Sequence, residues 1–164
     1  MQAKIEECRK KQPYPSDMLR LAYIGVPAVY GRHLYKYLEE NGARVVFNEI
    51  QRQFSMPGTP QNLAEQYCNY TYPYSTEERI RDIKSAIEER RVDAVIHYVQ
   101  AFCHRAISDI LFRQALDVPI LTIEGNNGFF LSQHLRTRIE AFLDIIRQRR
   151  KRQSCYNKTA GNNS

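Results

Sequence analysis

Short apolar segments alternate along the chain with longer segments in which apolar side chains recur at helical spacing. The short segments are rich in β-branched and aromatic residues, which is typical of strands packed on both faces. They lie at residues 20–25, 43–47, 92–99 and 118–123. The segments with helical spacing lie at residues 31–41, 62–70, 76–91, 108–116 and 135–146. This alternation predicts an α/β fold: a parallel four-stranded sheet of the Rossmann or flavodoxin-like kind, with right-handed crossovers and helices on both faces.

Local signals predict where several elements begin and end. Ser75 or Thr76 is a suitable N-cap for the helix that follows, and Gly42 stands where a left-handed residue commonly ends a helix. The segment from Gln51 to Pro60 shows no clear period. We therefore expect a long loop there, at the edge of the sheet.

A strand order of 2-1-3-4 would place the ends of the first and third strands beside each other, where open parallel sheets bind ligands. The turn from Gly25 to Tyr30 would then face the turn from Gln100 to Arg105. The first turn has neither the Gly-x-Gly-x-x-Gly pattern of dinucleotide sites nor a Gly-x-x-x-x-Gly-Lys-Ser/Thr phosphate loop. The sequence therefore predicts a ligand crevice without the usual nucleotide signatures.

A chain of 164 residues is long enough for one domain with a substantial core. We expect the α/β domain over residues 20–146, an N-terminal helical or linker remnant over 1–19, and a basic, disordered tail over 147–164. No stretch is apolar over the roughly 18 residues that a membrane span requires, and the charged start lacks the apolar segment of a secretory signal. We therefore expect a cytoplasmic protein without a membrane partner.

The net charge of +6 comes from the C-terminal end of the chain. Six basic and no acidic residues follow Ile146, whereas the other 18 basic residues are matched by 18 acidic ones. A localised basic run is typical of a solvated helix end or a tail. Nucleic-acid binding, for which this run would be the site, is therefore the least favoured of the functions considered.

Cys103 is the residue whose position points most directly to chemistry. It lies in the turn between the third strand and the next helix, on the edge where α/β sheets hold their ligands. The other cysteines, at positions 8, 68 and 155, form no close pair, so neither a zinc knuckle nor a redox Cys-x-x-Cys motif is present. From its position alone, Cys103 is a metal or cluster ligand, a nucleophile or a packed thiol.

Several short motifs follow one another in an order that is itself informative. They are Gly25-Val26-Pro27, Phe47-Asn48-Glu49, Arg52-Gln53-Phe54-Ser55-Met56-Pro57, Tyr70-Thr71-Tyr72-Pro73-Tyr74, Glu78-Arg79-Ile80, Ile96-His97-Tyr98-Val99-Gln100-Ala101-Phe102-Cys103-His104-Arg105, Leu121-Thr122-Ile123-Glu124-Gly125 and Arg136-Thr137-Arg138-Ile139-Glu140-Ala141-Phe142. In this order, over residues 13–146, the chain resembles the last domain of 2-hydroxyacyl-CoA dehydratase and benzoyl-CoA reductase subunits. It looks like the D-component of 2-hydroxyglutaryl-CoA dehydratase.

The resemblance implies an iron–sulfur subunit that acts on acyl-CoA thioesters. In that family three cysteines hold a 4Fe-4S cluster, two from upstream domains and one from the turn that Cys103 matches. An iron without a cysteine ligand can bind a non-protein ligand. One electron from an ATP-hydrolysing iron–sulfur activator makes a ketyl radical, from which the 2-hydroxyl group leaves. The implied partners are the activator, the acyl-CoA, and another dehydratase subunit or the missing N-terminal domains.

The chain departs from the family pattern in two ways. We expect the upstream domains with the other cysteines to lie outside this sequence, and residues 125–130 replace the family's Gly-Asp and Pro-Gly turn after the fourth strand. We expect a C-terminal domain that is inactive alone and whose cluster is completed by other domains or chains. The alternative is a non-catalytic flavodoxin-like binding or regulatory module in which Cys103 is a packed thiol.

Other polar residues near the ligand edge are candidates for contact with the cofactor or substrate. His104 and Arg105 could stabilise the thiolate by hydrogen bonds or charge; the alternative is that they face solvent at a helix start. Gln100 and Ser55 are expected at loop or strand ends, where an acyl-CoA thioester would lie. Glu124, after the fourth strand, is the candidate catalytic acid or base, with a turn or capping role as the alternative.

Three further residues have a structural role as their first interpretation. Arg52 could pair with a CoA phosphate, but an ordinary surface arginine is the favoured prediction. His97 lies within a strand and is predicted to be a hydrogen-bonded core histidine. Cys68, in a predicted helix, is expected to be a core or surface residue rather than a ligand.

Overall fold

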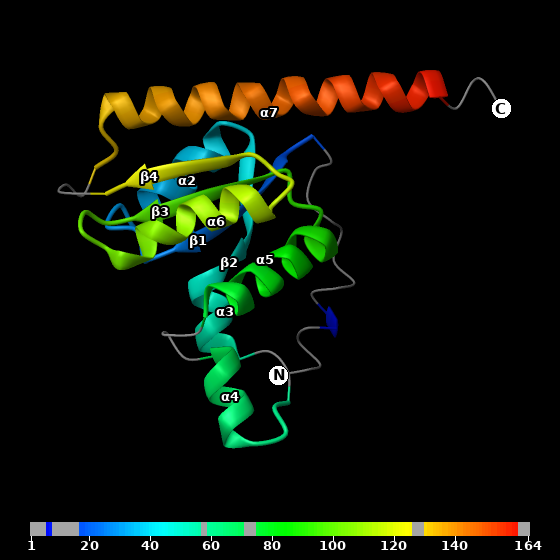
Figure 1. Ribbon diagram of the computed structural model, residues 1–164. Coiled ribbons are helices and arrows are strands. Elements are labelled where there is room, and N and C mark those ends of the chain that lie inside the picture. The colour runs from blue at the N-terminus through cyan, green and yellow to red at the C-terminus, as the bar shows by residue number, and fades with distance from the viewer. Residues whose placement is uncertain (1–5, 8–16, 57–58, 71–74, 126–129, 161–164) are drawn as a thin grey trace.

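The structure, a computed structural model, describes residues 6–7, 17–56, 59–70, 75–125 and 130–160, with side chains described as far as Gln153. Its strands are β1 (Leu19–Gly25), β2 (Ala43–Asn48), β3 (Ala94–Val99) and β4 (Ile120–Glu124). They form one parallel sheet in the order β2-β1-β3-β4 (Figure 1). The α/β fold predicted from the sequence is confirmed, and the strand order is the one that places the ends of β1 and β3 beside each other.

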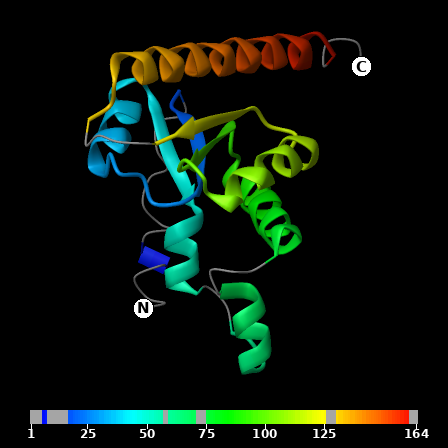
Figure 2. The same cartoon turned by 60° about the vertical axis from the view of Figure 1, so that its left-hand side comes forward.

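Helices cover both faces of the sheet. They are α2 (Arg32–Glu40), α3 (Glu49–Ser55), α4 (Leu63–Tyr70), α5 (Thr76–Arg90), the 3-10 helix η1 (His104–Ile107), α6 (Ser108–Ala115) and α7 (Gln133–Ala160). Helices α2 and α7 lie on one face, and α5 and α6 lie on the other (Figures 1 and 2). Helix α4 extends away from the sheet and has no buried residue (Figure 2).

The sheet has an apolar core on each face, because successive side chains of a strand point to opposite sides. From β1, Leu21 and Tyr23 pack with buried side chains of α2 and α7. Ala22 and Ile24 pack with those of α5 and α6. All residues of β3 are buried. Burial on both faces explains why these strands are continuous apolar runs in the sequence rather than alternating ones.

The prediction of a loop over residues 51–60 was wrong at its start, where the structure has α3. The Asn48 side-chain oxygen accepts hydrogen bonds from the backbone N–H groups of Ile50 and Gln51, at 2.9 and 3.1 Å, and so caps the helix. The helix ends at Met56, whose backbone is left-handed, with φ +41°. A helix of 7 residues makes about two turns, which is too short to establish a period in the sequence.

The last helix also differs from the prediction, because α7 continues beyond Ile146 to Ala160 where a disordered tail was expected. Three of its arginines donate hydrogen bonds to backbone carbonyl groups at the amino ends of the strands: Arg147 to Asn41, Arg149 to Asp117 and Arg150 to Met18. These bonds hold the helix against the domain, and no Gly or Pro interrupts it. Predictions for residues 1–5, 8–16, 57–58, 71–74, 126–129 and 161–164 fall outside the described residues.

Gly25 ends β1 in a conformation that favours glycine, with φ +106°. A Cβ atom at this position would lie 2.0 Å from the Tyr98 carbonyl oxygen of β3. The same carbonyl accepts a hydrogen bond from the Val26 backbone N–H, at 3.1 Å. The close approach of the ends of β1 and β3 therefore requires glycine.

A buried ion pair also holds the end of β1. Glu49, at the start of α3, accepts two hydrogen bonds from the Arg79 guanidinium of α5, at 2.7 and 2.9 Å. Its carboxylate accepts a third from the Gly25 backbone N–H, at 2.8 Å. Only 2–3% of each side chain is exposed, and the guanidinium lies over the Phe112 ring of α6. One carboxylate therefore joins β1, α3 and α5.

Gly25→Ala should lower the free energy of unfolding by about 2–3 kcal/mol, because the new methyl group meets the Tyr98 carbonyl oxygen and φ becomes strained. Gly31→Ala is the matched control. Gly31 also has positive φ, +49°, but nothing lies within 4 Å of an added Cβ atom, so we expect a loss of about 1 kcal/mol. Urea unfolding of the three proteins measures both losses, and equal losses would contradict the steric argument.

Removing one member of the ion pair should be costly, because the remaining charge is left buried. Glu49→Ala and Arg79→Ala should each lower the free energy of unfolding by about 3–5 kcal/mol. The double variant should lose clearly less than the sum, because the two losses share one interaction. A double-mutant cycle by urea unfolding tests this.

The control for this cycle is the ion pair between Arg81 and Glu78, in which the arginine is 73% exposed. Arg81→Ala should change the free energy of unfolding by less than about 1 kcal/mol. Strictly additive losses for Glu49→Ala and Arg79→Ala would mean that the two buried side chains act independently.

Candidate functional site

The turn after β3 places Cys103 at the carboxyl edge of the sheet. Its backbone N–H donates to the Gln100 carbonyl oxygen at 3.0 Å, and its own carbonyl oxygen accepts from the Ala106 N–H at 2.9 Å. Cys103 is therefore held as the N-cap residue of η1. Its side chain is free, half-buried and packed against the core that includes α2 and α7. The residue is neither enclosed in the core nor fully exposed.

The residue before Cys103 has an unusual backbone. Phe102 has φ +61°, which is rare for a bulky side chain, and its ring is fully exposed. Ile107, Ile110 and Leu111 of η1 and α6 are exposed as well, at spacings that share one helix face. An exposed apolar helix face therefore follows the Cys103 turn directly in the chain. Such faces are typical of interaction surfaces.

The predicted site residues near this turn differ in burial. Gln100 and His104 are exposed on either side of Cys103. Arg105 is buried and lines a separate pocket. Glu124 ends β4, where its backbone pairs with the end of β3, and its side chain is exposed rather than enclosed in an apolar crevice. The fold thus brings Gln100, Cys103, His104 and Glu124 to one edge of the sheet.

Ser55 does not join that group. It is the exposed last residue of α3, and its hydroxyl donates to the Arg52 carbonyl oxygen at 3.2 Å. It lines a hollow beside the edge strand β2, with Tyr35 and Arg44 among its neighbours. None of the described residues lining this hollow comes from the turn after β3. The predicted site residues are therefore divided between separate places.

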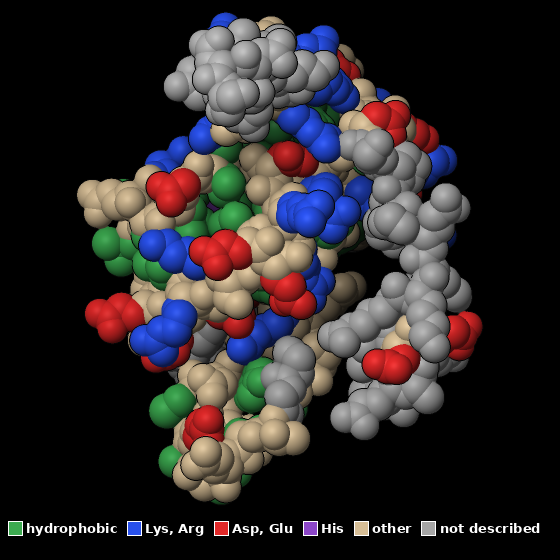
Figure 3. All heavy atoms as spheres, turned by 90° about the vertical axis from the view of Figure 1, so that its right-hand side faces the viewer, with side chains coloured by type: hydrophobic (Ala, Val, Ile, Leu, Met, Phe, Trp, Pro, Cys, Tyr) green, Lys and Arg blue, Asp and Glu red, His purple; other side chains and the backbone are tan. Residues whose placement is uncertain are grey.

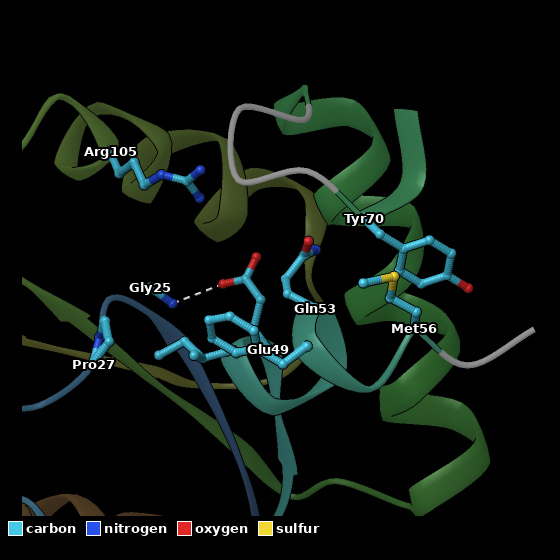
Figure 4. A pocket seen from close by; sticks show the side chains of 9 residues that line it. Gly25, Pro27, Glu49, Gln53, Met56, Tyr70 and Arg105 are labelled. Atoms are coloured by element: carbon cyan, nitrogen blue, oxygen red, sulfur yellow. Dashed lines mark hydrogen bonds between the residues drawn. The ribbon is translucent and has the colours of Figure 1, made fainter. Parts of the chain in front are cut away.

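A mainly apolar pocket of about 250 Å³ opens at the end of β1 (Figure 4). Helix α3 supplies much of its wall, including Glu49, Ile50 and Gln53. The side chains of Glu49 and Gln53 rise from α3, and the Arg105 guanidinium extends toward them from the turn after β3 (Figure 4). Cys103 is not among the described residues that line the pocket.

Some polar side chains that were not predicted as site residues have buried charged or amide atoms, among them Glu49, Gln53 and Arg79. A signal was available for Arg79, which precedes Ile83 by four residues and Ala86 by seven. It therefore shares the apolar face of α5. A charged side chain on such a face needs a buried partner. No comparable signal marked Gln53, because α3 is too short to define a face.

His97 has a structural role. It is fully buried, and its Nδ1 lies 2.7 Å from Oδ1 of Asp109 on α6. Burial lowers the pKa of His97 in spite of this carboxylate. Burial also opposes the charge of Asp109, but hydrogen bonds from His97, Thr122 and Arg113 outweigh it and lower the pKa of Asp109. The prediction of a hydrogen-bonded core histidine is confirmed at Nδ1, whereas Nε2 has no partner within the described chain.

Arg52 joins three helices. Its guanidinium pairs with Asp82 of α5 at 2.7 Å and donates to the Asn69 carbonyl oxygen of α4 at 2.6 Å. It also lies over the Tyr70 ring, 4.6 Å from the ring centroid. These contacts favour a structural role for Arg52 over pairing with a CoA phosphate.

Within the described part of the chain, no group of three or more His, Cys, Asp or Glu residues could hold a metal ion. Cys68 is an exposed free thiol on α4, the helix that extends from the body. The described residues therefore offer one thiol at the ligand edge of the sheet, not a complete metal site.

The face of the molecule in Figure 3 carries charges of both signs. Basic and acidic side chains are interspersed over it, and apolar side chains gather over α6 and, at the lower end, over α4. In the basic part of α7, Arg147 pairs with Asp144, and Arg149 binds a backbone carbonyl group. Among the described helices, none has both the length and the apolar content to cross a membrane.

A comparison with protein families matched most of the chain to one family. The model of the family described as 2-hydroxyglutaryl-CoA dehydratase, D-component, matches residues 1–146 of 164. The match includes all four strands and the Cys103 turn, and it ends where the basic part of α7 begins. A search among curated proteins gave no significant match. The chain therefore belongs to the family of the 2-hydroxyglutaryl-CoA dehydratase D-component.

Proposed function

We propose that this chain is the C-terminal domain of a 2-hydroxyacyl-CoA dehydratase-type iron–sulfur subunit, and that Cys103 supplies one thiolate ligand to its 4Fe-4S cluster. Membership of the family supports a dehydratase subunit. The observation that carries the ligand assignment is the position of Cys103, half-buried at the carboxyl edge beside the strained, exposed Phe102. A thiol that serves only in packing is usually enclosed in the core.

The described residues fit one ligand of a cluster and not a whole cluster site. Protein 4Fe-4S clusters are held by several cysteine thiolates, and no group of three possible ligands occurs in the described chain. The remaining thiolates would come from other domains or another chain. The exposed apolar face of η1 and α6 is consistent with such a partner. We therefore infer that the chain alone is inactive.

The residues at the ligand edge have separate roles in this proposal. His104, exposed directly after the thiol, would donate a hydrogen bond to the sulfur and stabilise the thiolate. Gln100 would bind the thioester carbonyl oxygen through its amide N–H. Glu124 is the candidate group for proton transfer at the departing 2-hydroxyl group. Arg105 and Ser55 lie elsewhere, so neither is assigned to the cluster.

The proposed partners follow from the chemistry of the cofactor. When bound, the cluster would supply a single electron to the acyl-CoA thioester, and an ATP-hydrolysing iron–sulfur activator would be the source of that electron. The second proposed partner is the subunit or domain that holds the other thiolates. Covering the apolar face beside Cys103 would exclude water from the site and tune the cluster potential.

A second candidate is a non-catalytic α/β binding or regulatory module derived from such a subunit. The observation in its favour is that the described residues do not contain the other ligands. The incomplete burial of Cys103 at the ligand edge favours the first candidate, because a thiol that serves only in packing is usually enclosed in the core. The iron content of the intact assembly separates the two.

Cys103→Ala should remove the cluster, because a site that loses one of three thiolates does not retain its metal. The full chain is tagged and purified anaerobically with the subunits that remain bound to it. Iron, acid-labile sulfide and the electron paramagnetic resonance signal of the reduced cluster are then measured. The wild-type assembly should contain all three, and the Cys103→Ala assembly should lose most of each.

Cys68→Ala and Cys155→Ala are the matched controls, and both assemblies should keep their iron. Equal iron in Cys103→Ala and Cys155→Ala would reject Cys103 as a ligand. A wild-type assembly that contains its bound subunits but no iron would favour the non-catalytic module.

A further inference from the structure

The pocket at the end of β1 contains an amide that the described structure does not use. Both polar side-chain atoms of Gln53, Oε1 and Nε2, are buried, and neither has a hydrogen-bond partner within the described chain. Buried polar groups are nearly always hydrogen-bonded. Figure 4 shows the Gln53 side chain rising from α3 into the pocket. An unpartnered amide that faces a cavity points to a ligand that completes its hydrogen bonds.

The neighbouring carboxylate does not complete these bonds. Glu49 accepts hydrogen bonds from the Gly25 N–H and from the Arg79 guanidinium. Its oxygens are therefore directed to other donors, and no bond between Glu49 and Gln53 is formed. The Gln53 amide keeps one donor and one acceptor side by side for a molecule in the pocket.

The pocket walls favour a compact, mainly apolar ligand. They include Pro27, Ile50, Phe54, Met56 and the Tyr70 ring. The volume of about 250 Å³ is below the range of about 300–1,000 Å³ that is usual for drug-sized ligands. A small aliphatic or aromatic body would fill this space.

We propose that this pocket binds a small molecule with an apolar body and one primary carboxamide or lactam group, paired reciprocally with the Gln53 amide. Such groups place an N–H donor and a carbonyl acceptor side by side, which matches the two free atoms of Gln53. A ketone offers an acceptor alone, and a carboxylate offers acceptors alone. The proposal does not depend on the cluster, because Cys103 does not line the pocket.

The test is a titration of the full, isotopically labelled chain followed by nuclear magnetic resonance. The probes are isovaleramide, its near-isosteric ketone 4-methyl-2-pentanone, in which methyl replaces the amino group, and isovalerate. Isovaleramide should bind about ten-fold more tightly than the ketone, because it alone satisfies both atoms of Gln53. The Gln53 side-chain amide and the Gly25 backbone amide should shift with saturation.

Variants separate the amide pair from simple burial of apolar surface. Gln53→Leu should abolish the preference for isovaleramide over the ketone while keeping ketone binding. Gln51→Leu is the matched control, since Gln51 lies on the same helix, is exposed and lines a different hollow; it should keep the preference. Gln53→Met provides a second, unbranched replacement in case the leucine variant does not fold.

Several results would overturn the proposal. The first is the absence of a saturable shift at the pocket with any probe. The second is a preference for isovaleramide over the ketone that is the same in Gln53→Leu as in the wild type. The third is tighter binding of isovalerate than of isovaleramide, which would assign the site to carboxylates. Thermal unfolding without ligand gives an independent check. Gln53→Leu should raise the unfolding midpoint by removing an unpaired buried amide, and a lower midpoint would show that Gln53 is already paired in solution.

Discussion

The carboxylate of Glu49 is the interaction on which the ligand edge of this sheet depends. It accepts hydrogen bonds from the last N–H of β1 and from a guanidinium of α5, and only 2–3% of the two paired side chains is exposed. In such surroundings a charge is tolerated only when its partners are in place. The carboxylate therefore determines where α3 leaves the sheet. Glu49 and the rest of α3 also supply much of the wall of the apolar pocket.

The other elements at this edge of the sheet are ordered, but several of their apolar side chains are exposed. Cys103 is held by backbone hydrogen bonds at the start of η1, next to a strained and exposed phenylalanine. Helix α4 buries none of its residues, and α6 exposes Ile110 and Leu111. A helix of eight residues gains little stability from its own hydrogen bonds, so α4 is better suited to contact with another surface. These features agree with a domain that works as part of a larger dehydratase assembly.

Much of the fold could be read from the sequence because its signals are local. The central strands β1 and β3 are buried on both faces, so their apolar runs stand out, and the long helix α5 shows its stripe and its Ser75 cap. Helix α3 and the C-terminal part of α7 were not predicted from the sequence. Helix α3 is too short for a period and depends on the Asn48 side chain, and the end of α7 depends on arginine bonds to carbonyl groups from distant strands.

The sequence by itself determined the alternation of strands and helices and placed Cys103 in the turn after the third strand, because these signals lie in neighbouring residues. The pairing order of the strands came from the structure. The structure alone decided which polar residues meet. Glu49 and Arg79 are 30 residues apart, and Arg105 and Ser55, both predicted near the thiol, are directed to other places. Such pairings depend on how helices cross the sheet. The way the helices cross is decided by packing in the folded molecule. A buried charge there needs a partner, and packing can supply that partner from a distant part of the chain.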